Sequence, residues 1–204
     1  RKRESITYIL SEKPLNCNFI NLIADFSKIK VYQTLLDNKT LVKINKFTEG
    51  QNTIIIPPLK MGENFTISAW VIPNLPTSGI IKSSYGDGFN SGWMIYVENE
   101  YLRVQWTNGL NKSYIKSREK LNKENLSLIN LVYNGNLTLY LNGKEQVTHS
   151  ASFKYDFKTS SLASPRIGAI WDIPTPKEIR SLIMINQSLT NEQIKNDYNK
   201  DNAS

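Results

Sequence analysis

The chain has only one cysteine, Cys17, and only one histidine, His149, in its 204 residues. A single cysteine cannot form an internal disulfide. Together, Cys17 and His149 provide only two of the four ligands of a structural zinc site. Any Ser/His/Asp or Cys/His catalytic set would have to use His149, and no G-x-S-x-G nucleophile motif accompanies it. We therefore expect His149 to be a surface or strand-end residue, and the cysteine usage leaves the redox compartment open.

Long apolar runs are also missing. The longest candidate, residues 53–58, is stopped by two prolines and falls far short of the roughly 18 residues that a membrane-spanning helix needs. No signal peptide is visible, and the charged residues 1–4 are typical of the cut end of a longer chain, so we interpret the sequence as an excised domain or a mature fragment. Its length is enough for one all-β sandwich with a sizeable core.

The sequence has little that could serve as a pair of catalytic carboxylates. A retaining glycosidase holds two of them roughly 5–5.5 Å apart around the glycosidic bond. The nearest imitation is Glu98 and Glu100, which lie at an expected hairpin turn where side chains point into solvent. Glycosidase activity is therefore disfavoured.

Basic residues outnumber acidic ones by 25 to 18, which gives a formal net charge of +7. Such a charge favours an acidic partner: nucleic acid, anionic lipid, or a sialylated or sulfated glycan. The lysines are scattered along the chain, however, and the codon bias of an AT-rich genome would produce the same excess. No recognised nucleic-acid-binding motif is present, so we expect no nucleic-acid partner.

What the chain does contain is a series of short segments with a period of two. Residues 65–71 and 137–141 alternate apolar and polar side chains, which predicts half-buried antiparallel strands. The second runs into Asn142-Gly143, and Asn134-Gly135 precedes it; both dipeptides favour tight hairpins because their turn positions need positive φ. Further strands are expected at residues 40–44, 53–56, 79–82, 93–97, 101–106, 114–115, 128–133, 166–170 and 178–185, with a loop over residues 83–92.

One helix is expected, close to the C-terminus. Residues 190–193 read Thr-Asn-Glu-Gln, a capping box, and Leu189 with Ile194 would form its hydrophobic staple. Ile194 and Tyr198 lie four residues apart and would share the buried side of the helix. With about a dozen short strands before it, the helix completes an all-β sandwich or jelly roll. We expect an extended lead-in over residues 1–20 and a single domain over residues 21–204.

Several motifs, in this order along the chain, resemble the laminin-G-like, concanavalin-A-like jelly-roll family. They are ADFS at residues 24–27, NFTISAWV at 64–71, SGWMIYV at 91–97, LTLYLNGK at 137–144, and the closing strand and helix at 179–199. The resemblance covers roughly residues 20–200 and implies two curved antiparallel sheets and a glycan-binding or adhesion role. The Asn/Lys/Ile-rich style also resembles the jelly-roll part of the receptor-binding region of clostridial neurotoxins.

The chain departs from this family in two places. Many members have a tryptophan where this sequence has Ser127 and Leu128, so one core aromatic is missing or supplied from elsewhere. The E-x-D-x-x-E motif of the family's glycosidases is absent, so the resemblance implies no catalytic role.

The strands at residues 93–97 and 101–106 have one apolar and one polar face. The apolar faces, with Trp93, Ile95, Val97, Leu102, Val104 and Trp106, are the expected core. On the other face Tyr96, Arg103 and Gln105 would form a surface that stacks a sugar ring and binds its hydroxyls. Thr138 and Tyr140 would join it if their hairpin belongs to the same sheet. The alternative is an ordinary solvated sheet face.

Loops at the rim of the sandwich supply further candidate ligands. Asp87 and Asn90 suit sugar hydroxyls, although the glycine-rich loop that carries them would also serve as a plain connection. Trp171 lies in a loop and would be either an exposed stacking residue or a core plug. Calcium needs several oxygen ligands. Asp25, Asp87 and Asp172 are candidates, and Asp25 and Asp172 are preferred because the resemblance implies sites that link the start and the end of such domains.

The sequence thus predicts an all-β, two-sheet antiparallel jelly-roll sandwich (concanavalin A-like) with a short C-terminal helix. Its expected role is a non-catalytic carbohydrate-binding or adhesion module of a larger secreted or surface protein, of the kind found in bacterial toxins. The expected partners are a cell-surface glycan, acidic in view of Arg103 and the net charge, and neighbouring domains of the parent chain. The alternative is a structural or protein-docking module with no sugar site.

Overall fold

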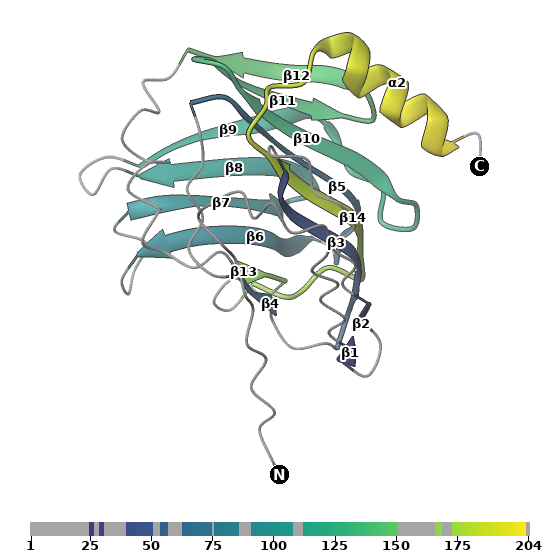
Figure 1. The fold of residues 1–204 in the computed structure, drawn as a ribbon. Helices are drawn as coiled ribbons and strands as arrows, with labels where there is room; N and C mark the ends of the chain where they lie inside the picture. Colours follow the sequence, from purple (N-terminus) through teal and green to yellow (C-terminus); the bar gives the residue numbers. More distant parts are fainter. Residues whose placement is uncertain are drawn as a thin grey trace, which may run out of the picture.

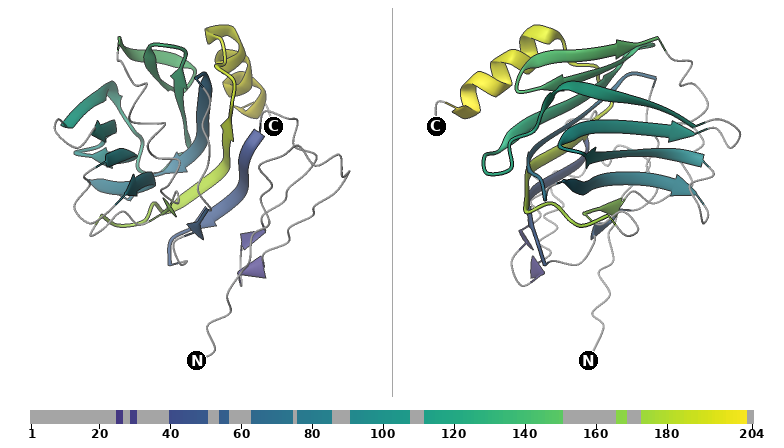
Figure 2. Two further views of the ribbon diagram at one scale, coloured as in Figure 1. Left: turned by 60° about the vertical axis from the view of Figure 1, so that its left-hand side comes forward. Right: turned by 180° about the vertical axis from the view of Figure 1, so that it is seen from behind.

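The computed structural model describes residues 25–26, 29–30, 40–50, 54–56, 63–74, 76–85, 91–107, 112–150, 166–168 and 173–202. In the part of the chain that the structure describes, two six-stranded antiparallel sheets lie face to face, and a C-terminal helix lies outside them (Figures 1 and 2). This arrangement confirms the predicted sandwich. The predicted lead-in over residues 1–20 lies outside the described residues.

The first sheet has the strand order β12-β11-β10-β5-β14-β3, and the second has the order β4-β13-β6-β7-β8-β9. The strands of the first sheet are β3 (Thr40–Thr48), β5 (Phe65–Ile72), β10 (Ser127–Tyr133), β11 (Leu137–Leu141), β12 (Lys144–His149) and β14 (Glu178–Ile185). Those of the second are β4 (Ile54–Ile55), β6 (Thr77–Tyr85), β7 (Ser91–Glu98), β8 (Tyr101–Thr107), β9 (Lys112–Lys120) and β13 (Arg166–Ile167). A separate pair, β1 (Asp25–Phe26) and β2 (Ile29–Lys30), lies near one end of β3 (Figure 1).

The hydrophobic core fills the space between the two sheets. Alternate residues of each strand point inward, as the period of two predicts. On β7 these are Trp93, Ile95 and Val97, and all three are buried. The inward residues of β8 are Leu102, Val104 and Trp106, and those of β5 are Phe65, Ile67, Ala69 and Val71. The predicted core faces of β7 and β8 are therefore confirmed.

The predicted hairpins are confirmed by the backbone of their turns. Asn142 and Gly143 connect β11 to β12 with φ of 51° and 74°, and Gly135 lies between β10 and β11 with φ of 95°. The β7–β8 turn places Asn99 and Glu100 at φ of 52° and 72°. Two positive φ values in a two-residue loop suit the right-handed twist of the strands on either side.

The predicted loop over residues 83–92 is shorter than expected. β6 continues to Tyr85 and β7 starts at Ser91, because Ser83, Ser84 and Tyr85 pair with Trp93, Gly92 and Ser91. β9 is likewise nine residues long where the sequence indicates only residues 114–115. In both places pairing with a neighbouring strand extends a segment whose own sequence is a weak strand signal.

One buried glutamine joins the two sheets at their β9 and β12 edges. The side-chain Oε1 of Gln146 accepts hydrogen bonds from the backbone N–H groups of Arg118 and Glu119, at 3.1 and 2.9 Å. These donors lie on β9, whereas Gln146 lies on β12. The bonds satisfy backbone groups at the edge of the second sheet and close the sandwich on this side.

Helix α2 (Asn191–Asn202) covers part of the outer face of the first sheet (Figure 1). Its predicted capping box is present: Thr190 Oγ1 accepts from the Gln193 N–H at 3.2 Å, and Gln193 Oε1 accepts from the Thr190 N–H at 2.9 Å. Ile194 is fully buried against Val132 and Tyr140, with Leu189 beside it. In the described part of the chain, no helix is long and apolar enough to span a membrane.

Candidate functional site

The outward face of β7, β8 and β9 carries the polar residues that the sequence singles out. Residues directly paired across antiparallel strands point to the same side of a sheet. Two rows of paired residues cross the three strands here. They are Tyr96–Arg103–Lys116 and Met94–Gln105–Tyr114. The structure therefore brings Tyr96, Arg103 and Gln105 onto one face, as predicted, and adds Tyr114 and Lys116.

Tyr114 is the most exposed aromatic residue of this face, with 60% of its surface accessible to solvent. The guanidinium carbon of Arg103 lies 5.1 Å from the centre of its ring, a cation–π contact that holds the ring in place. The sequence analysis missed Tyr114 as a site residue. Its signal is the alternation of outward Lys112, Tyr114 and Lys116 with inward Ile115, which places an aromatic ring among cations on a polar face.

Arg103 contacts both the Tyr114 ring and the Glu98 carboxylate. Its Nη1 lies 2.7 Å from Glu98 Oε2, and its side chain is 22% exposed. Its Nε is buried and has no hydrogen-bond partner within the described part of the chain. Because a guanidinium group carries five N–H donors, the ion pair with Glu98 does not use all of them.

Tyr96 occupies a different position from the one predicted. The sequence suggests an exposed stacking residue, but only 4% of Tyr96 is exposed, since Met94 and Ile173 pack against it. Ile173 belongs to the segment that leads into β14, and the carbonyl of Pro174 in that segment accepts a hydrogen bond from the Gly79 N–H at 2.8 Å. The Tyr96 hydroxyl donates to Gln105 Oε1 at 3.3 Å. Tyr96 therefore positions Gln105 and is not itself a stacking platform.

This burial raises the pKa of the Tyr96 phenol, and the nearby Glu98 carboxylate raises the pKa further, while Arg103 opposes the change. The folded state then keeps the phenol neutral where the unfolded chain ionises it. Its contribution to stability is complete below the ordinary tyrosine pKa of about 10 and is lost as pH rises through the raised folded value. We expect Tyr96→Phe to flatten the alkaline fall in the free energy of unfolding, measured in urea between pH 8 and 11.5. Identical alkaline curves for the two proteins would contradict this account.

Tyr101 lies on the same face but is covered by the chain's own cations. Lys116 Nζ lies 4.4 Å and Lys120 Nζ 5.7 Å from its ring centre. Lys120 also pairs with Glu100. Tyr114 is therefore better placed than Tyr101 to receive a flat ligand.

The hairpin that carries Thr138 and Tyr140 belongs to the other sheet, which corrects the suggestion that these residues extend the surface. β11 pairs with β10 and β12 in the first sheet. Tyr140 is buried there under α2, and its hydroxyl donates to Asn191 Oδ1. Because burial dominates, and Glu145 adds to it, the pKa of this phenol is also raised.

The remaining predicted ligands lie outside the described residues: Asp87, Asn90, Trp171 and Asp172. Asp25 lies on β1, but its side chain is not described either. Within the described part, no three His, Cys, Asp or Glu residues form a group that could hold a metal ion. The calcium site and the rim-loop contacts stay predictions. His149 ends β12, is exposed, and lies 5.5 Å from the Trp106 ring, which confirms the expected strand-end position.

Comparison with known proteins gives a family and a fold. The family model of the concanavalin A-like lectin/glucanases superfamily matches residues 48–195. No curated protein sequence matches the chain at a significant level.

Solved structures of similar fold include binding domains of botulinum neurotoxins. The serotype D binding domain is 18% identical, with 81% of this chain and 45% of that chain covered and a TM-score of 0.56. The neurotoxin DC binding domain in complex with rat synaptotagmin II is 21% identical, with 76% and 42% covered and a TM-score of 0.55. A structure of botulinum neurotoxin type C, whose cell entry is described as dependent upon interaction with two ganglioside molecules, is 22% identical, with 76% and 42% covered and a TM-score of 0.55. The chain thus spans less than half the length of these structures.

Proposed function

Because the chain belongs to the concanavalin A-like lectin/glucanases superfamily, we propose that it is a non-catalytic carbohydrate-binding module of a larger secreted or surface protein. The observation that carries this proposal is the exposed Tyr114 ring, held by Arg103 beside Gln105 and Lys116. We call these four residues the Tyr114 surface. One binding domain of similar fold is in complex with rat synaptotagmin II, and the cell entry of another neurotoxin is described as dependent upon two ganglioside molecules, which supports a glycan partner outside the cell.

The Tyr114 surface has the chemistry of a sugar site. A tyrosine ring offers a flat apolar face to the C–H groups of a pyranose, and an amide fixes the direction of its hydroxyls. Arg103 and Lys116 supply charge-assisted donors for a carboxylate or sulfate group. An acidic glycan therefore fits the surface better than a neutral one, in agreement with the net charge of +7.

Two carboxylates near this surface, among the residues that the structure describes, are engaged in ion pairs. Glu98 pairs with Arg103, and Glu100 pairs with Lys120 at the neighbouring turn. A general acid and a nucleophile must instead face each other across a bound sugar. This arrangement supports binding without hydrolysis.

A glycan array with neutral, sialylated and sulfated glycans tests the proposal, first with calcium and then with chelator. We expect the chain to bind an acidic class, and Tyr114→Ala and Arg103→Ala each to weaken binding at least tenfold, about 1.4 kcal/mol. Tyr114→Phe should keep most of the affinity because it keeps the ring. Arg180→Ala is the matched control, since Arg180 also pairs with a glutamate but lies on the other sheet.

Two results would contradict the proposal. One is a lack of binding to every glycan in both conditions, which would favour the docking-module alternative. The other is binding that Tyr114→Ala leaves unchanged, which would move the site to the rim loops around Asp87 and Trp171. Loss of binding in chelator would support the calcium expected at Asp25 and Asp172.

A further inference from the structure

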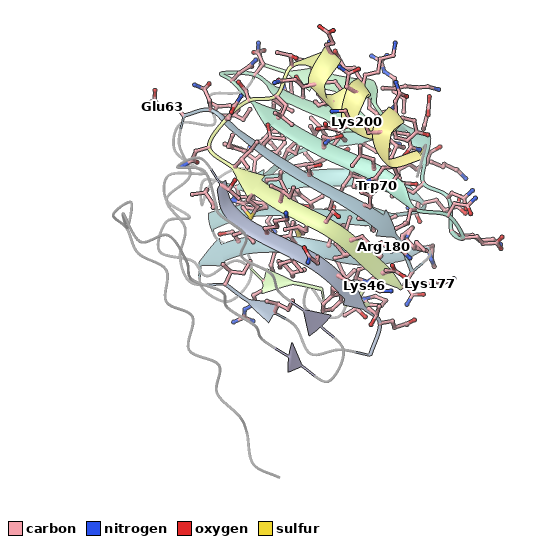
Figure 3. The ribbon with its side chains drawn as sticks, turned by 45° about the vertical axis from the view of Figure 1, so that its right-hand side comes forward. Lys46, Glu63, Trp70, Lys177, Arg180 and Lys200 are labelled. Atoms are coloured by element: carbon pink, nitrogen blue, oxygen red, sulfur yellow. The ribbon has the colours of Figure 1, made fainter. Side chains whose placement is uncertain are left out.

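Helix α2 covers only one side of the outer face of the first sheet. Ile194 packs on Val132 of β10 and Tyr140 of β11, and the Tyr198 ring stacks on Trp70 of β5 at 5.8 Å. β14 and β3 lie beyond Trp70. Their outward residues, together with Ile72 of β5, Glu49 just after β3 and Lys177 just before β14, form what we call the β3–β14 face. Figure 3 shows Lys46, Lys177 and Arg180 at one end of it, with Trp70 between Arg180 and Lys200 of α2.

Among the residues that the structure describes, the part of this face that α2 leaves uncovered is about as wide as one helix. Neighbouring strands are about 4.8 Å apart, and an α-helix with its side chains is about 10 Å across, so a helix covers roughly two strands. α2 already takes β10 and β11 and reaches β5. Within the described residues, β2 contacts β3, and the outward residues of β14 and β3 leave a width that a second helix beside α2 would fill.

The β3–β14 face combines apolar residues with a basic rim. Leu182 and Met184 point into the core, so Ile183 and Ile185 point outward, where both are half-buried, as is Ile72. Lys46 and Arg180 have side chains that are each 48% exposed. An apolar centre with polar residues around it is the usual anatomy of a protein interface.

The charges on this face favour an acidic partner. Counted over the described residues alone, four cations, Lys43, Lys46, Lys177 and Arg180, stand against two carboxylates, Glu49 and Glu178, a net charge of +2. Glu178, whose side chain is only 15% exposed, accepts from Arg180 and lies 3.4 Å from Lys46 Nζ. This carboxylate holds the two cations in place on the sheet, so part of the cost of ordering them is met before any partner arrives.

We propose that the β3–β14 face binds an acidic amphipathic helix of a partner protein, which lies beside α2. Two features favour a helix over the alternatives. An extended peptide adds to the edge of a sheet, whereas this surface is a face. A flat lipid surface would meet α2 first, because the helix stands about 10 Å above the sheet and keeps a plane away from β3 and β14. Helix α2 shows that the outer face of this sheet can bind a helix through two side chains four residues apart, Ile194 and Tyr198.

The test uses a synthetic 15-residue helical peptide with leucine at positions i, i+3, i+4 and i+7 and glutamate on the opposite side. We expect the chain to bind it with micromolar affinity in fluorescence anisotropy. Ile183→Asp, and separately the double variant Lys46→Gln/Arg180→Gln, should each weaken binding at least tenfold. Lys112→Gln/Arg118→Gln removes the same charge from the second sheet and should leave the affinity unchanged.

Three outcomes would overturn the proposal. A peptide with lysine in place of glutamate that binds as well would show that charge does not select the partner. Equal binding by all variants would place the peptide elsewhere. The third outcome concerns vesicles of phosphatidylserine and phosphatidylcholine. If the chain binds these vesicles but not the peptide, and Lys46→Gln/Arg180→Gln abolishes vesicle binding, the face is assigned to a lipid surface.

Discussion

Replacement of Gly168 by alanine is expected to lower the free energy of unfolding by about 4 kcal/mol. Gly168 follows β13 with φ of +103°, a region that residues with a Cβ rarely adopt, and such strain costs about 1–3 kcal/mol. A Cβ at this position would also lie 2.6 Å from Cζ of Phe47, a fully buried residue of β3. Because the ring is enclosed by the core, it cannot move aside without a further cost of about 1–3 kcal/mol.

The chain offers a control that separates the two costs. Gly135 has a similar φ of +95°, but a Cβ there would meet nothing within 4 Å. Gly135→Ala should therefore show the backbone cost alone, and the difference between the two variants should report the contact with Phe47. Urea unfolding measures the free energy of unfolding of both variants, and unchanged m-values show that the losses are losses of stability. Equal losses for the two variants would show that the core yields to the added methyl group. A partial recovery in Gly168→Ala/Phe47→Leu would confirm the contact as the cause.

Strands with local signals are predicted well from this sequence. The bounds of β5 and β14 are close to those expected, because alternation and flanking turn residues mark them without reference to the rest of the chain. β9 is the opposite case. Most of its outward residues are charged, so the sequence indicates a strand only at residues 114–115, and pairing with β8 gives β9 its full length. Strand content that depends on a neighbour is poorly visible in a single segment.

The candidate site divides in the same way. The sequence predicts that Arg103 and Gln105 share a face, because they are two residues apart on one strand. It also predicts that Tyr96 lies on that face, because the hairpin turn sets the pairing of β7 with β8. The burial of Tyr96 does not follow, because it depends on Ile173, which is far away in the sequence. Tyr114 was overlooked for a similar reason, since its place beside Arg103 depends on the register between β8 and β9. Sequence patterns thus place residues on a face but do not reveal what covers that face.

The second large effect is expected at the helix. Ile194→Asp should weaken the packing of α2 on the sheet by more than about 3 kcal/mol. The substitution removes a fully buried side chain and places a charge against Val132 and Tyr140. A helix of 12 residues is marginal by itself in water, so α2 depends on this contact and should fray once it is lost. Hydrogen exchange should then show α2 amides losing protection, while β5 and β10 stay protected because the core between the sheets is untouched.

Lys195→Asp is the matched control, because it introduces the same carboxylate at an exposed neighbouring position of the helix. It should leave the exchange of α2 nearly unchanged. If Ile194→Asp unfolds the whole sandwich, α2 is an integral part of the core and not a helix docked on the sheet. If the α2 amides stay protected in Ile194→Asp, the stacking of Tyr198 on Trp70 is sufficient to hold the helix on the sheet. The expected result, a helix that comes off while the sheet persists, would show that the outer face of this sheet binds helices through a few anchors. The β3–β14 face would then need only a similar pair of anchors from an acidic partner.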